Sequence, residues 1–288
     1  MATVTSLNYY SFAFNGFVFG GTNSPYQILS VDGLESLPNI RNQDDNRGYA
    51  DGMFTGNDFL SGRTVTITIN TFASTGYSAQ ANFNLLQAAL LPQTSGTTPL
   101  QFQLSAAGGL QRLNARVRTN KTVVDPNYTY GYITSQYTFF CADPRYYDDT
   151  LQTATLAVGN PLGRQYNRTY NLSYGGGSST LTTTVNNAGW ATTYPVITLN
   201  GPITNPTLGN NTQGTYITIQ GTYANTDTIV IDLDQKLITL NGSPARNLIN
   251  GGSNWFSAPP GNNSFFLAGT GTLIGTTAAT ITWRNAYI

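Results

Sequence analysis

The sequence predicts a mainly β protein, in which an N-terminal β domain with one α-helix and a β-hairpin is followed by a C-terminal β-sandwich. Three observations support this fold class. Short runs alternate between apolar and polar residues, only one run has helical spacing, and the composition changes near residue 150. We therefore expect two domains, residues 1–149 and residues 150–288.

Alternating runs define the N-terminal β domain. In Thr64–Asn70 every second residue is Val or Ile, which is typical of a strand with one buried face. Leu100–Leu104 and Leu113–Val117 alternate in the same way, and the glycine-containing Ala106–Gly109 joins them. This pattern predicts a β-hairpin.

One segment of the N-terminal domain has the spacing of a helix. Phe83, Leu86 and Leu90 recur at intervals of three and four residues, Ser78 is placed to cap the first turn, and Pro92 ends the run. We predict a helix of about three turns here.

The second domain begins where the chain becomes rich in Thr, Asn, Gly and Tyr, over Thr150–Asn187. Within that stretch, Gly175–Ser179 is either a plain turn or a mobile loop. The strands predicted beyond it are Val196–Leu199, Tyr216–Gln220, Thr228–Leu233, Leu237–Leu240 and Thr280–Trp283. Short strands separated by turns, with no helix between them, predict a β-sandwich.

The charge is low and balanced. Charged residues make up 9% of the chain, and 13 basic residues match 13 acidic ones, so nucleic-acid binding by charge is not expected. Interface cores are depleted of charge and enriched in Tyr, which suits a protein that is packed against neighbours. A single cysteine, Cys141, excludes an intrachain disulfide, and the first residues lack the pattern of a signal peptide. We expect folding in a cytoplasm and no membrane segment.

Catalytic chemistry has few candidates in this sequence. The chain contains no histidine, which removes the commonest general base and metal ligand, so we predict no enzyme, cofactor or metal site. Paired carboxylates leave glycoside cleavage as an open alternative. The pairs are Asp44 with Asp45, Asp148 with Asp149, and Asp232 with Asp234. We interpret them as turn, cap and strand-edge residues.

Exposed aromatic rings on β-sandwiches are able to stack on sugars. Trp190 and Trp255 are the candidates for carbohydrate contact, although Trp255 precedes a turn that it could simply pin. Trp283 alternates with Ile281 and is predicted to lie in the core.

Several segments resemble siphophage distal tail proteins, of the kind called minor tail proteins in phages of actinobacteria. The N-terminal segments are Phe12–Gly21 (FAFNGFVFGG), Tyr26–Gly52, Leu60–Ile69 (LSGRTVTITI) and Tyr137–Tyr147 (YTFFCADPRYY), the last with Asp143, Pro144 and Arg145 at the family's usual end of that domain. The C-terminal segments are Tyr166–Tyr174 (YNRTYNLSY), Asn187–Pro206, Ile229–Gly242 and Asn254–Asn262 (NWFSAPPGN). Each motif is weak alone, and their order carries the resemblance.

The resemblance implies a structural virion protein at the tip of a long, non-contractile tail. The N-terminal domain would assemble into a hexameric ring, and the C-terminal domain would be a galectin-like sandwich projecting outward. The ring would join the tail-tube protein to the tail-associated hub protein and leave a channel through which DNA passes. Synthesis and assembly would occur in the host cytoplasm. The alternative function is a carbohydrate-binding module that recognises the host cell wall.

Overall fold

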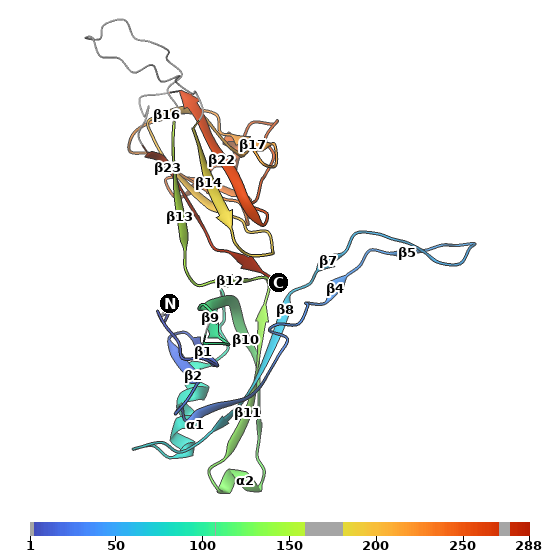
Figure 1. Cartoon of the computed structure of the whole chain (residues 1–288), viewed down its shortest axis with the longest axis vertical. Helices are drawn as coiled ribbons and strands as arrows, with labels where there is room; N and C mark the ends of the chain where they lie inside the picture. The colour runs from blue at the N-terminus through green and yellow to red at the C-terminus, as the bar shows by residue number, and fades with distance from the viewer. Residues whose placement is uncertain (1–2, 107, 159–180, 271–276) are drawn as a thin grey trace, which may run out of the picture. The chain divides into compact units, whose positions relative to one another are not determined.

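The structure is a computed structural model that describes residues 3–106, 108–158, 181–270 and 277–288 (Figure 1). It is built mainly of antiparallel strands, which confirms the predicted fold class. Two compact units divide the chain, one comprising Met1–Asp149 with Ile288 and the other Thr150–Tyr287. Tyr166–Tyr174 and Gly175–Ser179 lie outside the described residues.

The first unit contains one long helix, one short helix and strands β1 to β12. The strands that form its main sheets are β1 (Ser11–Phe14), β2 (Phe17–Gly20), β3 (Tyr26–Asp32), β8 (Arg63–Thr71), β9 (Thr98–Gln103), β10 (Gln111–Val123), β11 (Ile133–Cys141) and β12 (Tyr146–Asp148). Four short strands between β3 and β8 are β4 (Ile40–Arg41), β5 (Asp45–Asn46), β6 (Met53–Phe54) and β7 (Phe59–Leu60). The helices are α1 (Ala79–Ala89) and α2 (Pro126–Thr129).

The main strands of this unit follow the order β2-β1-β9-β10-β11-β8-β3. The long strand β10 belongs to two sheets, because Gln111–Ala115 pairs with β9 whereas the part from Arg116 to Val123 pairs with β11. The predicted strand at Thr64–Asn70 is confirmed within β8, and the predicted hairpin is confirmed as β9 and β10.

Aromatic side chains fill the space between the two sheets. Phe12 stacks on Phe19 and Phe102, with ring centroids 5.8 and 6.0 Å apart, and all three are buried. Phe14 meets Phe139 edge to face at 5.4 Å, which joins β1 of one sheet to β11 of the other. Aromatic pairs of this kind add about 0.5–1.5 kcal/mol each beyond the burial of their surface.

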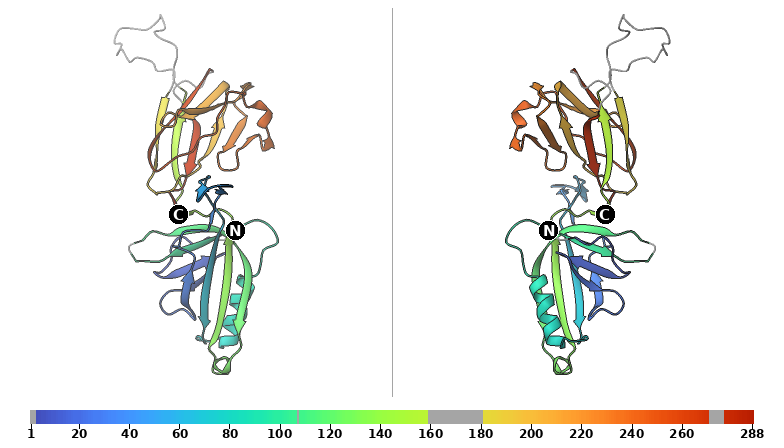
Figure 2. Two further views of the ribbon diagram at one scale, coloured as in Figure 1. Left: turned by 90° about the vertical axis from the view of Figure 1, so that its right-hand side faces the viewer. Right: turned by 90° about the vertical axis from the view of Figure 1, so that its left-hand side faces the viewer.

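Helix α1 confirms the predicted helix. The Ser78 side chain accepts a hydrogen bond from the backbone N–H of Ala81 at 3.2 Å, and the helix ends at the C-cap residue Leu90. The buried Asn82 donates to the carbonyl of Phe72 at 2.7 Å. The helix therefore lies against β8 and β11, as Figure 2 shows.

The described residues of the second unit form two antiparallel sheets. The larger has the order β13-β23-β15-β19-β20-β21 and the smaller β14-β22-β16-β17, with β18 paired to β16. The strands of the larger sheet are β13 (Gln152–Ala157), β15 (Val196–Asn200), β19 (Thr228–Asp232), β20 (Leu237–Leu240), β21 (Ser243–Pro244) and β23 (Thr277–Trp283). Those of the smaller sheet are β14 (Leu181–Asn187), β16 (Ile203–Asn210), β17 (Thr215–Thr218), β18 (Thr222–Tyr223) and β22 (Gly261–Thr270). A 3₁₀ turn, η1 (Arg246–Leu248), and the short strand β24 (Ala286–Tyr287) complete the unit.

One hydrophobic core lies between these sheets. Ile197, Ile231 and Ile281 of the larger sheet and Leu208 and Phe265 of the smaller sheet belong to the same buried cluster. The predicted β-sandwich is therefore confirmed for this unit, and the placement of Trp283 in its core is confirmed by an exposure of 8%.

Two of the segments that carry the resemblance meet in this unit. The buried Asn187 side chain donates to the carbonyls of Ala191 and Ala258, at 2.7 and 3.1 Å. The Asn263 amide donates to the carbonyl of Pro259 at 2.8 Å. These asparagines satisfy backbone carbonyls that would otherwise be buried without a partner.

Candidate assembly interface

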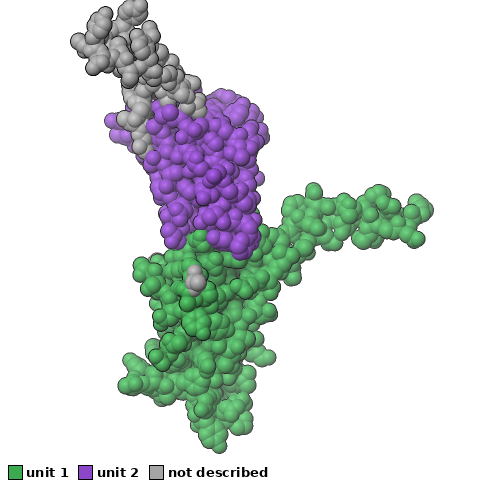
Figure 3. All heavy atoms as spheres, in the orientation of Figure 1, with its two compact units in different colours: residues 1–149, 288 green, residues 150–287 purple. Residues whose placement is uncertain are grey.

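A two-stranded ribbon, residues 33–62, extends from the first unit between β3 and β8 and is called the arm below. Ile40 and Arg41 of β4 pair with Leu60 and Phe59 of β7, and farther out β5 pairs with β6. Figures 1 and 3 show the arm standing clear of the rest of its unit. An isolated two-stranded ribbon is marginally stable at best in water.

The arm exposes an unusual amount of apolar side chain. Its exposed large apolar residues are Leu37, Ile40, Tyr49, Met53, Phe54, Phe59 and Leu60. Phe54 is 61% exposed and Leu37 is 64% exposed. Burying one such side chain contributes about 1.5–3 kcal/mol, and exposed apolar patches of this kind mark binding surfaces.

Polar contacts hold the two chains of the arm together. The guanidinium of Arg41 lies 5.5 Å from the ring centre of its cross-strand partner Phe59. The carboxylate of Asp44 accepts a hydrogen bond from the backbone N–H of Gly56 at 2.9 Å. A Cβ at Gly56 would lie 2.0 Å from the carbonyl oxygen of Gln43, so the two chains approach too closely there for any other residue.

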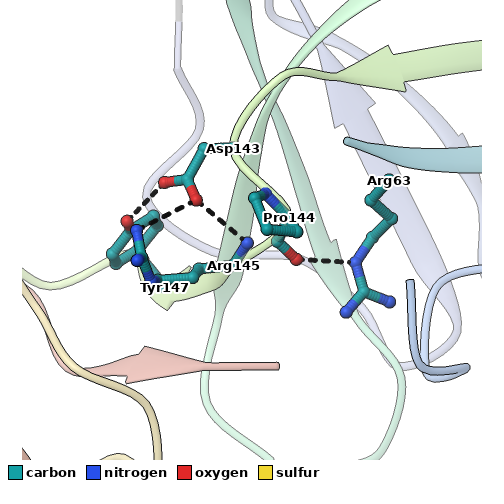
Figure 4. A network of polar contacts seen from close by, with 5 residues as sticks. All are labelled: Arg63, Asp143, Pro144, Arg145 and Tyr147. Carbon is teal, nitrogen blue, oxygen red and sulfur yellow. Dashed lines mark hydrogen bonds and ion pairs between the residues drawn. The ribbon is translucent and has the colours of Figure 1, made fainter. Parts of the chain in front are cut away.

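A buried arginine closes the base of the arm. Arg63 is 1% exposed and follows the arm directly in the sequence. Its Nη1 donates to the carbonyls of Gly33, at 3.0 Å, and Ser36, at 2.7 Å, and also to that of Leu34. Its Nε donates to the carbonyl of Pro144 at 2.8 Å (Figure 4). One side chain thus ties both ends of the arm to the end of β11.

The segment Asp143–Tyr147 forms a compact polar cluster beside this arginine (Figure 4). Asp143 accepts a hydrogen bond from the backbone N–H of Arg145 at 3.1 Å and forms an ion pair with the Arg145 side chain at 3.3 Å. The Tyr147 hydroxyl donates to the same carboxylate. Burial is the main reason why the pKa of Tyr147 is raised above its usual value. These contacts give the Asp-Pro-Arg motif a structural role.

The strands β8 and β11 present a polar outward face, defined by Thr64, Thr66, Thr68, Asn70, Thr134, Gln136 and Thr138 and called the threonine face below. These residues alternate with buried ones and are half-buried or exposed. The face carries no charged side chain on either strand. Phe140 lies at its end, with the guanidinium of Arg118 5.0 Å from the ring centre.

Members of each carboxylate pair form structural contacts, either with backbone N–H groups or with an arginine side chain. Asp232 accepts hydrogen bonds from the backbone N–H groups of Asp234 and Gln235, at 3.0 and 2.9 Å, and so closes the turn after β19. Asp149 forms an ion pair with Arg112 at 2.7 Å. Asp44 holds the arm together as described above.

The two predicted sugar-contact residues have different surroundings in the second unit. Trp190 is 64% exposed, and its ring meets Tyr287 edge to face with centroids 4.6 Å apart. Trp255 is half-buried and packs against the hydrophobic core. Carbohydrate binding by these two residues stays a prediction.

Other chemical sites are not apparent in the part of the chain that the structure describes. Cys141 is fully buried, and burial raises the pKa of its thiol to about 12. The described residues include no group of three His, Cys, Asp or Glu side chains arranged to hold a metal ion. Among the same residues, no helix has the length and apolar character needed to cross a membrane.

The arm was not predicted as an element of structure. Its apolar residues are separated by irregular intervals of polar residues and glycine, so neither a period of two nor a helical period emerges. One feature of the sequence could have indicated the arm: this segment contains large apolar residues, but their spacing fits neither a buried strand nor a buried helix.

Comparison with known proteins agrees with this architecture of two compact β units. Residues 188–287 match the family model of the siphovirus-type tail component, C-terminal domain. No curated protein matches the sequence. The crystal structure of the Dit protein of phage SPP1, described as a paradigm of the hub adsorption apparatus in phages that infect Gram-positive bacteria, has a TM-score of 0.66. The match has 15% sequence identity and covers 96% of this chain and 99% of that chain.

Two structures of the phage P2 baseplate in its activated conformation are also similar. The structure with calcium has a TM-score of 0.47 at 14% identity and covers 93% of both chains. The structure with strontium has a TM-score of 0.48 at 14% identity and covers 95% of this chain and 97% of that chain. Residues 188–287 thus match a siphovirus-type tail component family, and nearly the whole chain has the fold of the SPP1 Dit protein, so the predicted resemblance is confirmed.

Proposed function

We propose that this chain is a structural virion protein that forms a ring, most simply a hexamer, at the distal end of a long non-contractile phage tail. The observation that carries the proposal is the arm. It displays large apolar side chains that its own unit does not bury, in a ribbon that is marginally stable alone. A neighbouring copy of the same chain is the partner that is always present during assembly.

Binding of the arm to a different surface on the next copy would be a head-to-tail contact. Such contacts generate a closed ring when the rotation between copies divides a full turn evenly. Each copy then uses two patches, the arm and its receptor. The low charge and the many tyrosines of the chain suit this repeated packing.

The threonine face is the candidate lining of the central channel. Neutral hydroxyl and amide groups would keep the channel wall hydrated. Clustered Lys and Arg side chains bind DNA phosphates with release of counterions, and neutral groups do not. DNA would contact the protein only in transit. The tail-tube protein and the tail-associated hub protein would bind the two ends of the ring, and the second unit would be a galectin-like sandwich on its outside.

An arm variant tests the ring. In Met53→Ser with Phe54→Ser, the arm loses two apolar side chains that are 50% and 61% exposed, so folding of the units is not expected to suffer. Sedimentation velocity and negative-stain images should show rings for the wild type and monomers for this variant. Tyr130→Ser, at a site that is 78% exposed outside the arm, is the matched control and should still form rings. A wild type that stays monomeric at high concentration, or an arm variant that assembles normally, would count against the proposal.

Attachment to host carbohydrate is the second candidate function, and the exposure of Trp190 favours it. Its test is binding to purified cell-wall polysaccharide by the wild type and by Trp190→Ala and Trp255→Ala. Loss of binding in Trp190→Ala alone would fit a sugar-stacking ring. Equal binding by all three proteins would remove both tryptophans from consideration.

A further inference from the structure

Among the described residues, the sheet that carries the threonine face ends in an unpaired strand on each side. Its strand order is β10-β11-β8-β3, so β3 forms one edge. The other edge is the part of β10 from Arg116 to Val123, whose ladder among the described residues runs only to β11. Exposed strand edges readily pair with another chain.

The direction of the strands allows the edges of two copies to meet. Neighbouring strands are antiparallel throughout, so β3 and β10 at the two edges run in opposite directions. A rotation about an axis along the strands therefore brings β10 of one copy beside β3 of the next with antiparallel alternation preserved. An even number of strands per copy is what makes this possible.

The two edges carry opposite charges. Asp32, the last residue of β3, and Glu35 just beyond it are exposed, whereas β10 carries the exposed Arg118 and Lys121. Within the described ranges, none of these four side chains forms an ion pair. Arg116 is also on this edge, but its Nε donates to the carbonyl of Gly96 at 2.9 Å.

A hollow beside β3 has the volume and the lining residues to accept a long basic side chain. It has a volume of about 310 Å³, and its lining includes Tyr10 and Leu104 as well as Asp32 and Glu35. The stem of an arginine or lysine packs on apolar and aromatic surface while its charged end stays near water or an acid. Tyr10 and Leu104 offer apolar and aromatic surface for the stem, and the carboxylates of Asp32 and Glu35 offer acidic partners for the charged end.

We propose that β10 of one copy docks on β3 of the next, with Arg118 or Lys121 entering the Asp32–Glu35 hollow. This inference rests on the proposed ring and names the charged contact that fixes its register. The pairing pattern supports the register, because Asp32 lies in the same cross-strand row as Thr66, Thr138 and Thr119. A ring with its strands along the axis places this row beside the same row of the next copy, where Arg118 and Lys121 flank Thr119.

Paired charge reversals test the contact. The first variant, Asp32→Lys with Glu35→Lys, has two basic edges, and the second, Arg118→Glu with Lys121→Glu, has two acidic edges. Each alone should assemble about tenfold more weakly than the wild type in low salt, and the loss should shrink in high salt as the charges are screened. An equimolar mixture should assemble again, because alternating copies restore an acidic edge against a basic one at every joint. Arg246→Glu, an exposed reversal in the second unit, is the control that should assemble like the wild type.

The outcomes separate the two proposals. If the wild type forms no ring, the proposed function fails and this contact fails with it. If the wild type forms rings but both reversal variants also do so at wild-type concentrations, only the charged contact is overturned. Recovery in the mixture and not in either variant alone would support it, and it would also show that both variants fold.

Discussion

Replacing Arg63 with methionine should destabilise the first unit and leave the second unit intact. The guanidinium of Arg63 donates to four backbone carbonyls, three at the first end of the arm and one, that of Pro144, just after β11. Methionine keeps much of the aliphatic stem but donates no hydrogen bond. The substitution therefore removes one charged group and all of the contacts that it makes.

The expected size of the effect follows from these contacts. A buried acceptor that loses its donor costs about 1–3 kcal/mol, but water can reach the carbonyls that are only partly buried. Burying the charge of Arg63 has a desolvation cost, and the same burial lowers the pKa of the guanidinium. Removing the charge removes this cost, which offsets part of the loss in stability. We expect a net loss of about 3 kcal/mol in the free energy of unfolding, or about 1.5 M in the urea midpoint at a slope of about 2 kcal/mol per M.

The chain provides a separate probe for each unit. Its three tryptophans, Trp190, Trp255 and Trp283, all lie in the second unit, and its one cysteine, Cys141, lies in the first. Thiol labelling of Cys141 in increasing urea should show a lowered urea midpoint for the first unit. The urea midpoint of the second unit, followed by tryptophan fluorescence, should be the same as in the wild type. Arg116→Met, which removes one exposed hydrogen bond, is the matched control, with an expected loss of about 0.5 kcal/mol. An Arg63→Met shift no larger than that of the control would refute this account of the arm's base.

Three further predictions use the same probes. Without denaturant, Cys141 should resist thiol reagents at pH 8, because burial raises its pKa to about 12, and rapid labelling of the folded protein would contradict this. The buried Cys141 and Tyr137 both have a pKa raised to about 12, so their contribution to the stability of the first unit is complete below pH 9 and is lost as the pH rises toward 12. Urea midpoints by thiol labelling and tryptophan fluorescence at pH 8 and pH 11 should therefore diverge. Ile231→Ala, at a fully buried position of the sandwich, should cost about 2–5 kcal/mol in the tryptophan transition and leave the Cys141 transition in place.

Apolar periodicity predicted those strands and helices in which one continuous segment contains the whole pattern of buried and exposed residues. Thr64–Asn70 alternates because one face of β8 packs on the aromatic core, and the helix after Ser78 has its cap and its apolar stripe in one continuous segment. The predicted end of the second hairpin strand at Val117 was too early, since β10 continues to Val123. Beyond Val117 the strand leaves the core and pairs only with β11, so its exposed residues no longer alternate.

The arm could not be predicted by the same means. Periodicity reports burial within one chain, whereas the apolar residues of the arm have no burial partner in their own unit. The contacts of Arg63 at the base of the arm could not be predicted either. Its acceptors are backbone carbonyls, which every residue has, and Gly33, Ser36 and Pro144 are far from it in sequence.

Charges at the edges of a sheet have a second explanation, which is protection against unwanted pairing. Protection needs charge of either sign at each edge, and it works best when both edges carry the same sign, because like edges of different copies then repel. This sheet has acidic residues at β3 and basic residues at β10, an arrangement that attracts one edge to the other. The mixture of the two reversal variants distinguishes the explanations. Protective charges would leave both variants and their mixture equally able to assemble through the arm, whereas complementary charges require the mixture to recover what each variant has lost.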